Sequence, residues 1–129
     1  MLVVDDDFFN RKLVGGLLKE HAECDYAVNG KEALLAFEAA DSGQSPYDAI
    51  LIDYNMPEMD GIELIDMIRR REGEKGIDLE KGVPIIMITA HVEVFMKAFN
   101  KGVNDYLLKP VHRDMLLAKL KGLLDPEVS

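Results

Sequence analysis

Cysteine is nearly absent from this 129-residue chain, and tryptophan is missing altogether. Because Cys24 is the only cysteine, no disulfide can form within the chain, and a reducing, cytoplasmic location is expected. No apolar run approaches the roughly 20 residues that a membrane-spanning helix needs, so no membrane contact is expected. Strand-like sequence begins directly after Met1, which leaves no room for a signal peptide.

Basic residues are scarce relative to acidic ones. Fifteen Lys and Arg residues against 24 Asp and Glu residues give a net charge of -9 at pH 7. Phosphate backbones attract basic surfaces, so direct binding of nucleic acid is not expected. The 3 histidines are scattered and form no zinc-binding pattern. An excess of carboxylates suits a protein that gathers them around a cation.

Short apolar runs alternate with amphipathic segments along the chain, which is long enough for one domain with a substantial core. The predicted strands are residues 2–4, 24–28, 49–52, 85–88 and 106–108. The predicted helices are about residues 8–21, 30–40, 62–71, 93–101 and 113–124, followed by a frayed tail at residues 125–129. This alternation predicts a parallel sheet with right-handed crossovers.

Apolar spacing predicts which side of each helix is buried. In the first helix, Phe9, Leu13 and Leu17 recur every fourth residue and form one stripe. The inward residues expected in the second, third and fifth helices are Ala33, Leu34, Phe37, Leu64, Ile65, Ile68, Leu116, Leu120, Leu123 and Leu124. The charged, glycine-containing segment 72–82 is predicted to be a mobile loop.

The fourth predicted helix is unusually apolar. Phe95, Met96 and Phe99 follow one another closely there. We expect some of this trio to be exposed and to form part of a surface for a partner or a second copy of the chain.

Four of the five predicted strands end in a polar side chain. These strand ends carry Asp5 and Asp6, Asp53, Thr89, and Lys109. In a parallel sheet the carboxyl ends lie along one edge, so these residues are expected to converge on one crevice. The second strand ends neutrally at Asn29, which suggests an edge position. One of the three aspartates 5–7 is also expected to cap the first helix.

Together these residue types predict a Mg²⁺-dependent phosphoryl acceptor. Neighbouring carboxylates repel one another unless a cation neutralises them, and oxygen ligands without cysteine suit Mg²⁺. Asp53 is then a candidate nucleophile that forms an acyl phosphate. Lys109 would offset the charge of the phosphoryl oxygens, and Thr89 would donate a hydrogen bond to one of them.

Four motifs carry a family resemblance that covers essentially the whole chain. They are VVDDD at residues 3–7, ILIDYNMPEMDG at residues 50–61, MITA at residues 87–90 and DYLLKP at residues 105–110. In this order and spacing the chain resembles the receiver domain of bacterial response regulators. The resemblance implies a single receiver domain over residues 1–129. It also implies an α/β, flavodoxin-like fold, a doubly wound parallel sheet of five strands in the order 2-1-3-4-5 with five helices.

The resemblance also implies roles for individual residues. Asp53 would be the phosphorylation site, and Asp6 and Asp53 would bind Mg²⁺ directly together with the backbone carbonyl of Asn55. Asp5 would act largely through metal-bound water, while Lys109 would pair with the phosphoryl group and with an acid of the site.

A switch and partners follow from the same resemblance. Thr89 would move toward the phosphoryl oxygens, and Tyr106 would follow from an exposed to a buried position. The phosphoryl donor would be a phosphohistidine of a histidine kinase or phosphotransfer protein, and the domain would later hydrolyse its own acyl phosphate. The surface of the fourth helix, fifth strand and fifth helix would contact an effector domain, a target protein or a second copy.

Three other functions compete with this one. A haloacid-dehalogenase-type phosphatase needs a second Asp two residues after the nucleophile, where this chain has Asn55. A flavodoxin-like electron carrier needs a loop that cradles phosphate after the first strand, where aspartates 5–7 would repel it. A receiver that serves only as a scaffold is disfavoured by the intact set of site residues. The output stays open between a free-standing regulator and a part of a transcription factor or hybrid kinase.

Overall fold

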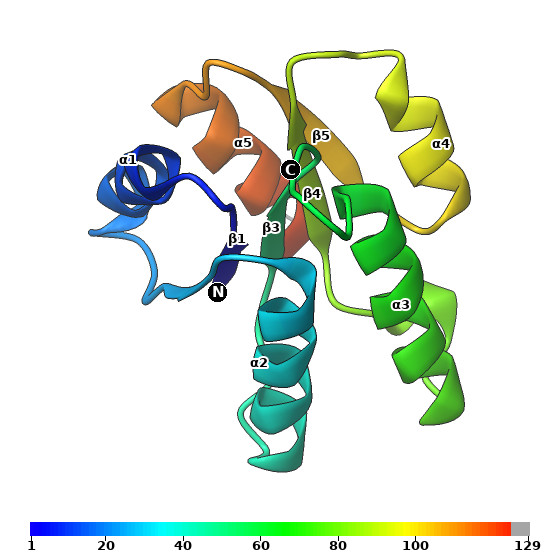
Figure 1. The fold of residues 1–129 in the computed structure, drawn as a ribbon. Helices are drawn as coiled ribbons and strands as arrows, with labels where there is room; N and C mark the ends of the chain where they lie inside the picture. The colour runs from blue at the N-terminus through cyan, green and yellow to red at the C-terminus, as the bar shows by residue number, and fades with distance from the viewer. Residues whose placement is uncertain (125–129) are drawn as a thin grey trace.

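The computed structural model describes residues 1–124, which form five parallel strands and five α-helices (Figure 1). The strands are β1 (Leu2–Val4), β2 (Asp25–Ala27), β3 (Ile50–Asp53), β4 (Ile85–Thr89) and β5 (Asp105–Leu108). The helices are α1 (Phe8–Leu18), α2 (Gly30–Ser42), α3 (Gly61–Glu74), α4 (Val94–Asn100) and α5 (Arg113–Leu124), with a short 3₁₀ helix η1 (Leu79–Lys81) before β4. The predicted tail at residues 125–129 lies outside the described residues. Within residues 1–124, none of the helices has the length and apolarity to cross a membrane.

The strand order is β2-β1-β3-β4-β5, and all four pairings are parallel. This confirms the predicted flavodoxin-like topology and the edge position of β2. Val4 pairs with Ile52, and Ile52 pairs with Met87, so the three central strands reach the same edge in register. These strands are buried on both sides because helices cover both faces of the sheet.

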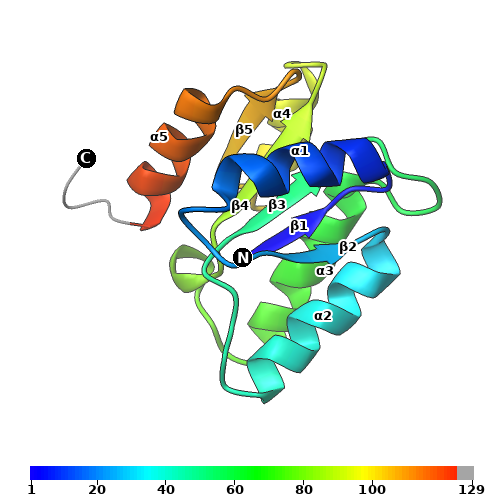
Figure 2. The same cartoon turned by 90° about the vertical axis from the view of Figure 1, so that its left-hand side faces the viewer.

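Helices α1 and α5 cover one face of the sheet, and α2, α3 and α4 cover the other (Figures 1 and 2). Side chains alternate between the faces along each strand, which divides the core into two clusters. On the α1/α5 side, Val3, Leu51 and Ile86 pack against Val14 and Leu116. On the other side, the packed residues include Val4, Ile52, Met87, Phe37, Leu64 and Ile68.

The predicted apolar stripe of α1 is wrong for Phe9 and Leu13, although Leu17 packs against the core on the α1/α5 side. Phe9 is 79% exposed and Leu13 is 49% exposed, whereas Val14 and Leu18 are buried. Gly15 explains this orientation, because the Tyr26 hydroxyl lies where a β-carbon on residue 15 would be. With β2 packed against the glycine, the side of α1 that faces the sheet is turned toward Val14 and Leu18.

The buried faces of the other helices largely follow the prediction. The expected inward residues of α2 and α3 are all buried: Ala33, Leu34, Phe37, Leu64, Ile65 and Ile68. In α5, Leu116 and Leu120 are buried, but Leu124 is exposed at the end of the helix. Asn29 caps α2, since its side chain accepts a hydrogen bond from the N–H of Glu32.

The segment predicted as a loop from residue 72 begins as helix, because α3 continues to Glu74. Glu72 is buried and is held on both carboxylate oxygens. Its Oε1 accepts a hydrogen bond of 2.7 Å from Nη1 of Arg69, and its Oε2 accepts one of 2.7 Å from the N–H of Val83. The buried carboxylate of Glu72 therefore anchors Val83, just after the predicted loop, to α3.

The same arginine fastens the turn between α4 and β5. Nε of Arg69 donates to the carbonyl of Gly102 over 2.9 Å, and Nη2 donates to Oδ1 of Asn104 over 2.9 Å. That oxygen also accepts the N–H of Ile85, the first residue of β4, over 2.8 Å. A polar network thus fixes the entry of β4 at the edge of the sheet away from the acidic residues.

Candidate functional site

The carboxyl edge of the sheet brings together the charged residues that the sequence predicted to converge there. Asp5 and Asp6 follow β1, Asp53 ends β3, and Lys109 follows β5. One carboxylate oxygen from each of the three aspartates lies within 4.8 Å of the others. Residues far apart in the sequence therefore form one acidic cluster with a lysine beside it.

Asp53 is the most buried member of the cluster, with 2% of its surface exposed. Nζ of Lys109 lies 2.6 Å from its Oδ1. The two groups form an ion pair, and beyond it Oδ1 has no hydrogen-bond partner among residues 1–124. Burial raises the pKa of Asp53 to about 6, the charge of Asp5 adds to the increase, and Lys109 opposes it. Asp53 is therefore mostly ionised at neutral pH, but at a cost in free energy.

The three consecutive aspartates have different partners. Asp5 is buried, and its Oδ1 accepts the N–H of Asp7 over 2.9 Å. Burial raises the pKa of Asp5, while this hydrogen bond and Lys109 counteract the increase. Asp7 is the predicted helix cap, since its Oδ1 accepts the N–H groups of Phe9 and Asn10. Asp5 and the exposed Asp6 are thus left to face Asp53.

The β3–α3 loop is held tightly against the end of β3. A β-carbon on Gly61 would lie 2.8 Å from the carbonyl oxygen of Asp53, so only glycine fits at this approach. Buried Met56 fastens the middle of the loop to the core. Glu58 has a left-handed φ of 69°, and the N–H of Met59 donates to the carbonyl of Pro57 across it. The loop thus presents Asn55, which is exposed, two residues after Asp53.

Thr89 ends β4 and is buried at the same edge. Its Oγ1 accepts the N–H of His91 over 3.0 Å and donates to the carbonyl of His91 over 3.4 Å. The hydroxyl is therefore engaged by the turn that leads into α4. A move of Thr89 toward Asp53 would have to break these two contacts.

Tyr106 on β5 is half-buried and stacks against α4. Its ring centroid lies 4.7 Å from that of Phe95 and 4.7 Å from Nζ of Lys119 on α5. The sequence reasoning singled out Tyr106 and Phe95 separately but missed their contact, and it missed Lys119. The only sequence signal for Lys119 is its place on the predicted helix after the strand that carries Tyr106.

The donor set of the acidic cluster fits a hard divalent cation. Asp5, Asp6 and Asp53 offer oxygen ligands within reach of one another, and Oδ1 of Asp53 is a buried oxygen without a hydrogen bond in the described chain. Cysteine and histidine are absent from this cluster. These features match the all-oxygen coordination that Mg²⁺ prefers.

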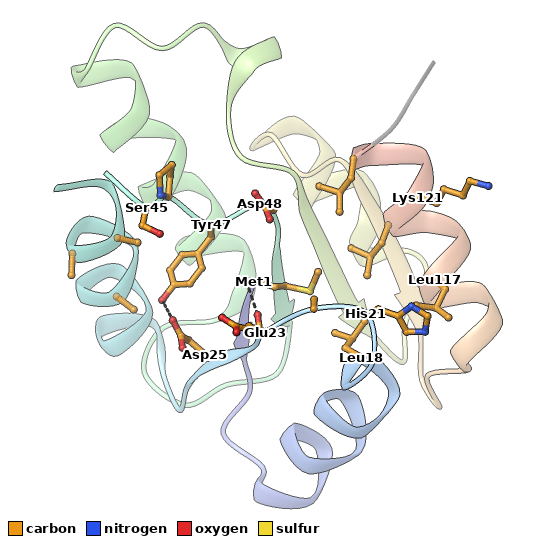
Figure 3. Close-up of a pocket in the computed structure, with 17 residues that line it drawn as sticks. Met1, Leu18, His21, Glu23, Asp25, Ser45, Tyr47, Asp48, Leu117 and Lys121 are labelled. Carbon is orange, nitrogen blue, oxygen red and sulfur yellow. Dashed lines mark hydrogen bonds between the residues drawn. The ribbon is translucent and has the colours of Figure 1, made fainter. Parts of the chain in front are cut away.

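A separate hollow of about 990 Å³ lies at the opposite edge of the sheet (Figure 3). Its lining includes Met1, Asp25, Tyr47 and Lys121. The Tyr47 hydroxyl donates to Oδ2 of Asp25 over 2.8 Å, and burial together with this bond raises the pKa of Tyr47 to about 12. The Tyr47 proton is therefore not available near neutral pH.

Comparison with known proteins connects this geometry to one family. The profile of the response regulator receiver domain matches residues 1–121. Hybrid signal transduction histidine kinase L of Dictyostelium discoideum is 39% identical over 116 residues, which is 88% of this chain and 6% of that protein. Transcriptional regulatory protein ResD of Bacillus subtilis is 36% identical over 127 residues, which is 96% of this chain and 47% of that protein.

A solved structure shows the same relationship. The co-crystal structure of the Saccharomyces cerevisiae phosphotransfer protein Ypd1 and the receiver domain of Ssk1 matches with a TM-score of 0.85 and 29% identity, covering 99% of this chain and 90% of that chain. The chain thus spans a small part or about half of the curated relatives it matches. With the profile match, the shared fold and the acidic edge in agreement, the chain belongs to the response regulator receiver domain family.

Proposed function

We propose that the chain accepts a phosphoryl group on Asp53 from a phosphohistidine, in a reaction that depends on Mg²⁺. The observation that carries this proposal is the buried carboxylate of Asp53, whose Oδ1 lacks a hydrogen bond in the described chain and lies 2.6 Å from Nζ of Lys109. A phosphoryl acceptor needs a carboxylate lone pair that is not taken up by a backbone hydrogen bond, and a neighbouring positive charge to offset the incoming phosphoryl oxygens. Asp53 and Lys109 provide both.

The residues of the site have distinct roles in the transfer. A carboxylate oxygen of Asp53 forms the bond to phosphorus as the bond to the imidazole nitrogen breaks, and the imidazole keeps that electron pair. Asp6, Asp53 and the backbone carbonyl of Asn55 would hold Mg²⁺, with Asp5 beside them, and the ion would supply positive charge that offsets the phosphoryl oxygens. In the second half of the cycle, water attacks the phosphorus, the bond between phosphorus and the Asp53 oxygen breaks, and inorganic phosphate leaves as the carboxylate is restored. The chain is thus a phospho-acceptor that assists its own phosphorylation and dephosphorylation, not an enzyme with a separate substrate.

A phosphohistidine-bearing partner would approach along α1 and the β5–α5 turn. A hollow of about 320 Å³ adjoins Asp5 and Lys109, and its lining includes Leu13, Pro110 and Val111. These apolar side chains lie next to the carboxylates, which suits a partner that must bring a phosphohistidine to Asp53. The related Ssk1 receiver domain was crystallised with a phosphotransfer protein, which supports a histidine kinase or phosphotransfer protein as this partner.

The surface of α4, β5 and α5 is the proposed output. Thr89 and Tyr106 would act as the switch, because Thr89 borders the turn into α4 and Tyr106 stacks on that helix through Phe95. The added phosphoryl group carries about 1.5–2 negative charges, enough to bias a two-state element. The exposed apolar residues on this surface include Met96, Phe99, Leu108 and Met115. They suit an effector domain, a target protein or a second copy of the chain, in the cytoplasm that the single cysteine suggests.

The proposal is tested by intact mass. The protein is mixed with Mg²⁺ and acetyl phosphate, beside an Asp53→Asn variant. We expect one labile phosphoryl group on the unaltered protein and none on the variant. A stable adduct on both proteins would place the acceptor elsewhere. An unaltered protein that neither gains mass nor forms a beryllofluoride complex would overturn the proposal and favour a scaffold.

A further inference from the structure

The ring of Tyr106 lies between an aromatic ring from α4 and an ammonium group from α5. The Phe95 and Tyr106 centroids are 4.7 Å apart with planes tilted by 44°, and Nζ of Lys119 lies 4.7 Å from the Tyr106 centroid on α5's side. Both distances fall within the range of favourable aromatic and cation–π contacts. Tyr106 is therefore held by the two helices that flank its strand, and we call these three residues the Tyr106 sandwich.

Lys119 is itself fixed by β5. Its Nζ donates to Oδ1 of Asp105 over 2.8 Å, and the same oxygen accepts the N–H of Tyr106 over 2.8 Å. The Asp105 carboxylate thus connects the Lys119 ammonium to the backbone of Tyr106, and the ammonium lies over the Tyr106 ring. The charge of Lys119 stays over the Tyr106 ring because its ion-pair partner, Asp105, is the residue before Tyr106.

Phe95 is a main attachment of α4 to the sheet. The helix has 7 residues, its fully buried residue is Ala98, and Glu93 provides no side-chain cap within the described chain. Phe95 packs against the core cluster on the α2/α3/α4 side as well as against Tyr106. The position of α4 therefore depends on the position of the Tyr106 ring.

Thr89 and Tyr106 lie on neighbouring strands and on the same face. Tyr106 pairs in register with Met87, and Leu108 pairs with Thr89. Alternation along β4 places Thr89 and Met87 on the side that α4 covers. A displacement of Thr89 away from the His91 turn thus changes the space beside Tyr106.

We infer that Phe95 and Lys119 are positioning residues that hold Tyr106 against α4 and thereby oppose the displacement of Thr89 toward a phosphoryl group on Asp53. The inference rests on the proposed function and adds its regulation. Because linkage is reciprocal, any contact that opposes the displaced arrangement weakens the binding of the group that favours it. The Tyr106 sandwich therefore sets how strongly the site holds a phosphoryl group or its mimic.

The first arm of the test observes the ring itself. The protein contains 4 tyrosines, so 3-fluorotyrosine labelling gives four ¹⁹F resonances, and a Tyr106→Phe variant assigns the one of interest. We expect Phe95→Leu and Lys119→Met to shift the Tyr106 resonance, and Phe95→Tyr, which keeps a ring, to restore it. Phe8→Leu and Lys97→Met are matched controls, since both residues are exposed. An unmoved Tyr106 resonance in Phe95→Leu would overturn the sandwich.

The second arm measures the coupling to the site. Beryllofluoride is titrated in Mg²⁺, with the Tyr106 resonance as the readout of saturation. We expect Phe95→Leu and Lys119→Met to bind beryllofluoride roughly three- to tenfold more tightly than the unaltered protein, with Phe95→Tyr and both controls unchanged. Unchanged or weaker binding in Phe95→Leu and Lys119→Met would overturn the inference. If the unaltered protein formed no complex and gained no phosphoryl group from acetyl phosphate, the proposed function would fall, and the coupling with it, while the first arm would still decide the contact.

Discussion

Arg69 and Glu72 form an ion pair with 2.7 Å between Nη1 and Oε1, although their side chains are only 8% and 6% exposed. They lie three residues apart on α3 and connect that helix to the entry of β4 and to the α4–β5 turn. An ion pair this deeply buried stabilises a fold only while both partners and their hydrogen bonds are present.

Glu72→Ala is therefore expected to lower the free energy of unfolding by about 3–5 kcal/mol, because it leaves the Arg69 guanidinium buried without its counter-charge. Urea denaturation at pH 7 measures this loss. Arg70→Ala is the matched control, since Arg70 pairs with Asp66 on the exposed side of the same helix. That variant should lose no more than about 0.5 kcal/mol. Equal losses in both variants would contradict the structural role of the buried pair.

The buried carboxylate of Asp53 is expected to destabilise the folded protein at neutral pH. Folding raises the pKa of Asp53 from 3.8 to about 6, so the folded state favours the protonated form. The destabilisation is absent below about pH 4, grows as the pH rises, and is complete above about pH 6. Without Mg²⁺, Asp53→Asn should thus be about 1–3 kcal/mol more stable than the unaltered protein at pH 7.5 and equally stable at pH 4. Urea denaturation at several pH values measures the difference in stability between the two proteins. A difference that does not change with pH would count against burial of Asp53 as its cause.

The acidic cluster predicts that removing the charge of Asp6 weakens Mg²⁺ binding more than removing the charge of Asp7. Asp6→Asn should weaken Mg²⁺ binding about tenfold or more, since it removes a charged ligand. Asp7→Asn removes the same charge one residue further on, but Asn keeps the helix cap that Asp7 provides. It should therefore change the affinity much less. Isothermal titration with Mg²⁺ compares the two, and similar losses would mean that only the overall charge matters.

The left-handed residue in the β3–α3 loop predicts a stabilising substitution. Glu58 has a φ of 69°, which side chains with a β-carbon adopt at a cost. Glu58→Gly should raise the free energy of unfolding by about 0.5–1 kcal/mol, whereas Glu58→Ala should leave it nearly unchanged. Thermal unfolding of the two variants provides the comparison. A loss of stability in Glu58→Gly would show that this part of the loop gains nothing from glycine's backbone freedom.

The exposed side of α4 predicts variants that lose self-association but are still phosphorylated. Met96 is 64% exposed and Phe99 is 57% exposed, and neither lies in the acidic cluster. The double variant Met96→Gln, Phe99→Gln should be phosphorylated like the unaltered protein but should lose any self-association that beryllofluoride induces. Sedimentation velocity with and without beryllofluoride tests this. Association that persists in the double variant would move the interface to another surface.

The topology could be predicted because each strand and helix is encoded locally. Buried strands such as Ile85–Ile88 are continuous apolar runs, and each ends in a polar residue that must lie at the sheet edge. The side of α1 could not be predicted in this way. Its orientation depends on Tyr26 lying on Gly15, which joins residues from different elements, so a regular spacing of Phe9 and Leu13 pointed to the wrong side.

The same limit applies to the site. Asp53, Lys109 and Thr89 were predictable because they end strands that must lie side by side. The partners of Tyr106 and the anchoring of Glu72 were not, since they depend on helix lengths and side-chain directions. The charges and glycines after residue 72 indicated a mobile loop, and nothing nearby in the sequence shows that Arg69 and Val83 bind Glu72 from two sides.

Strand β4 is paired with β3 and β5 along its length, and side chains restrain both of its ends. At its start, Oδ1 of Asn104 accepts the N–H of Ile85 and is itself bound by Arg69 of α3. At its end, the Thr89 hydroxyl makes two contacts with the backbone of His91 in the turn before α4. A rearrangement beside Asp53 would therefore meet the turn before α4 first, while the start of β4 stays tied to α3.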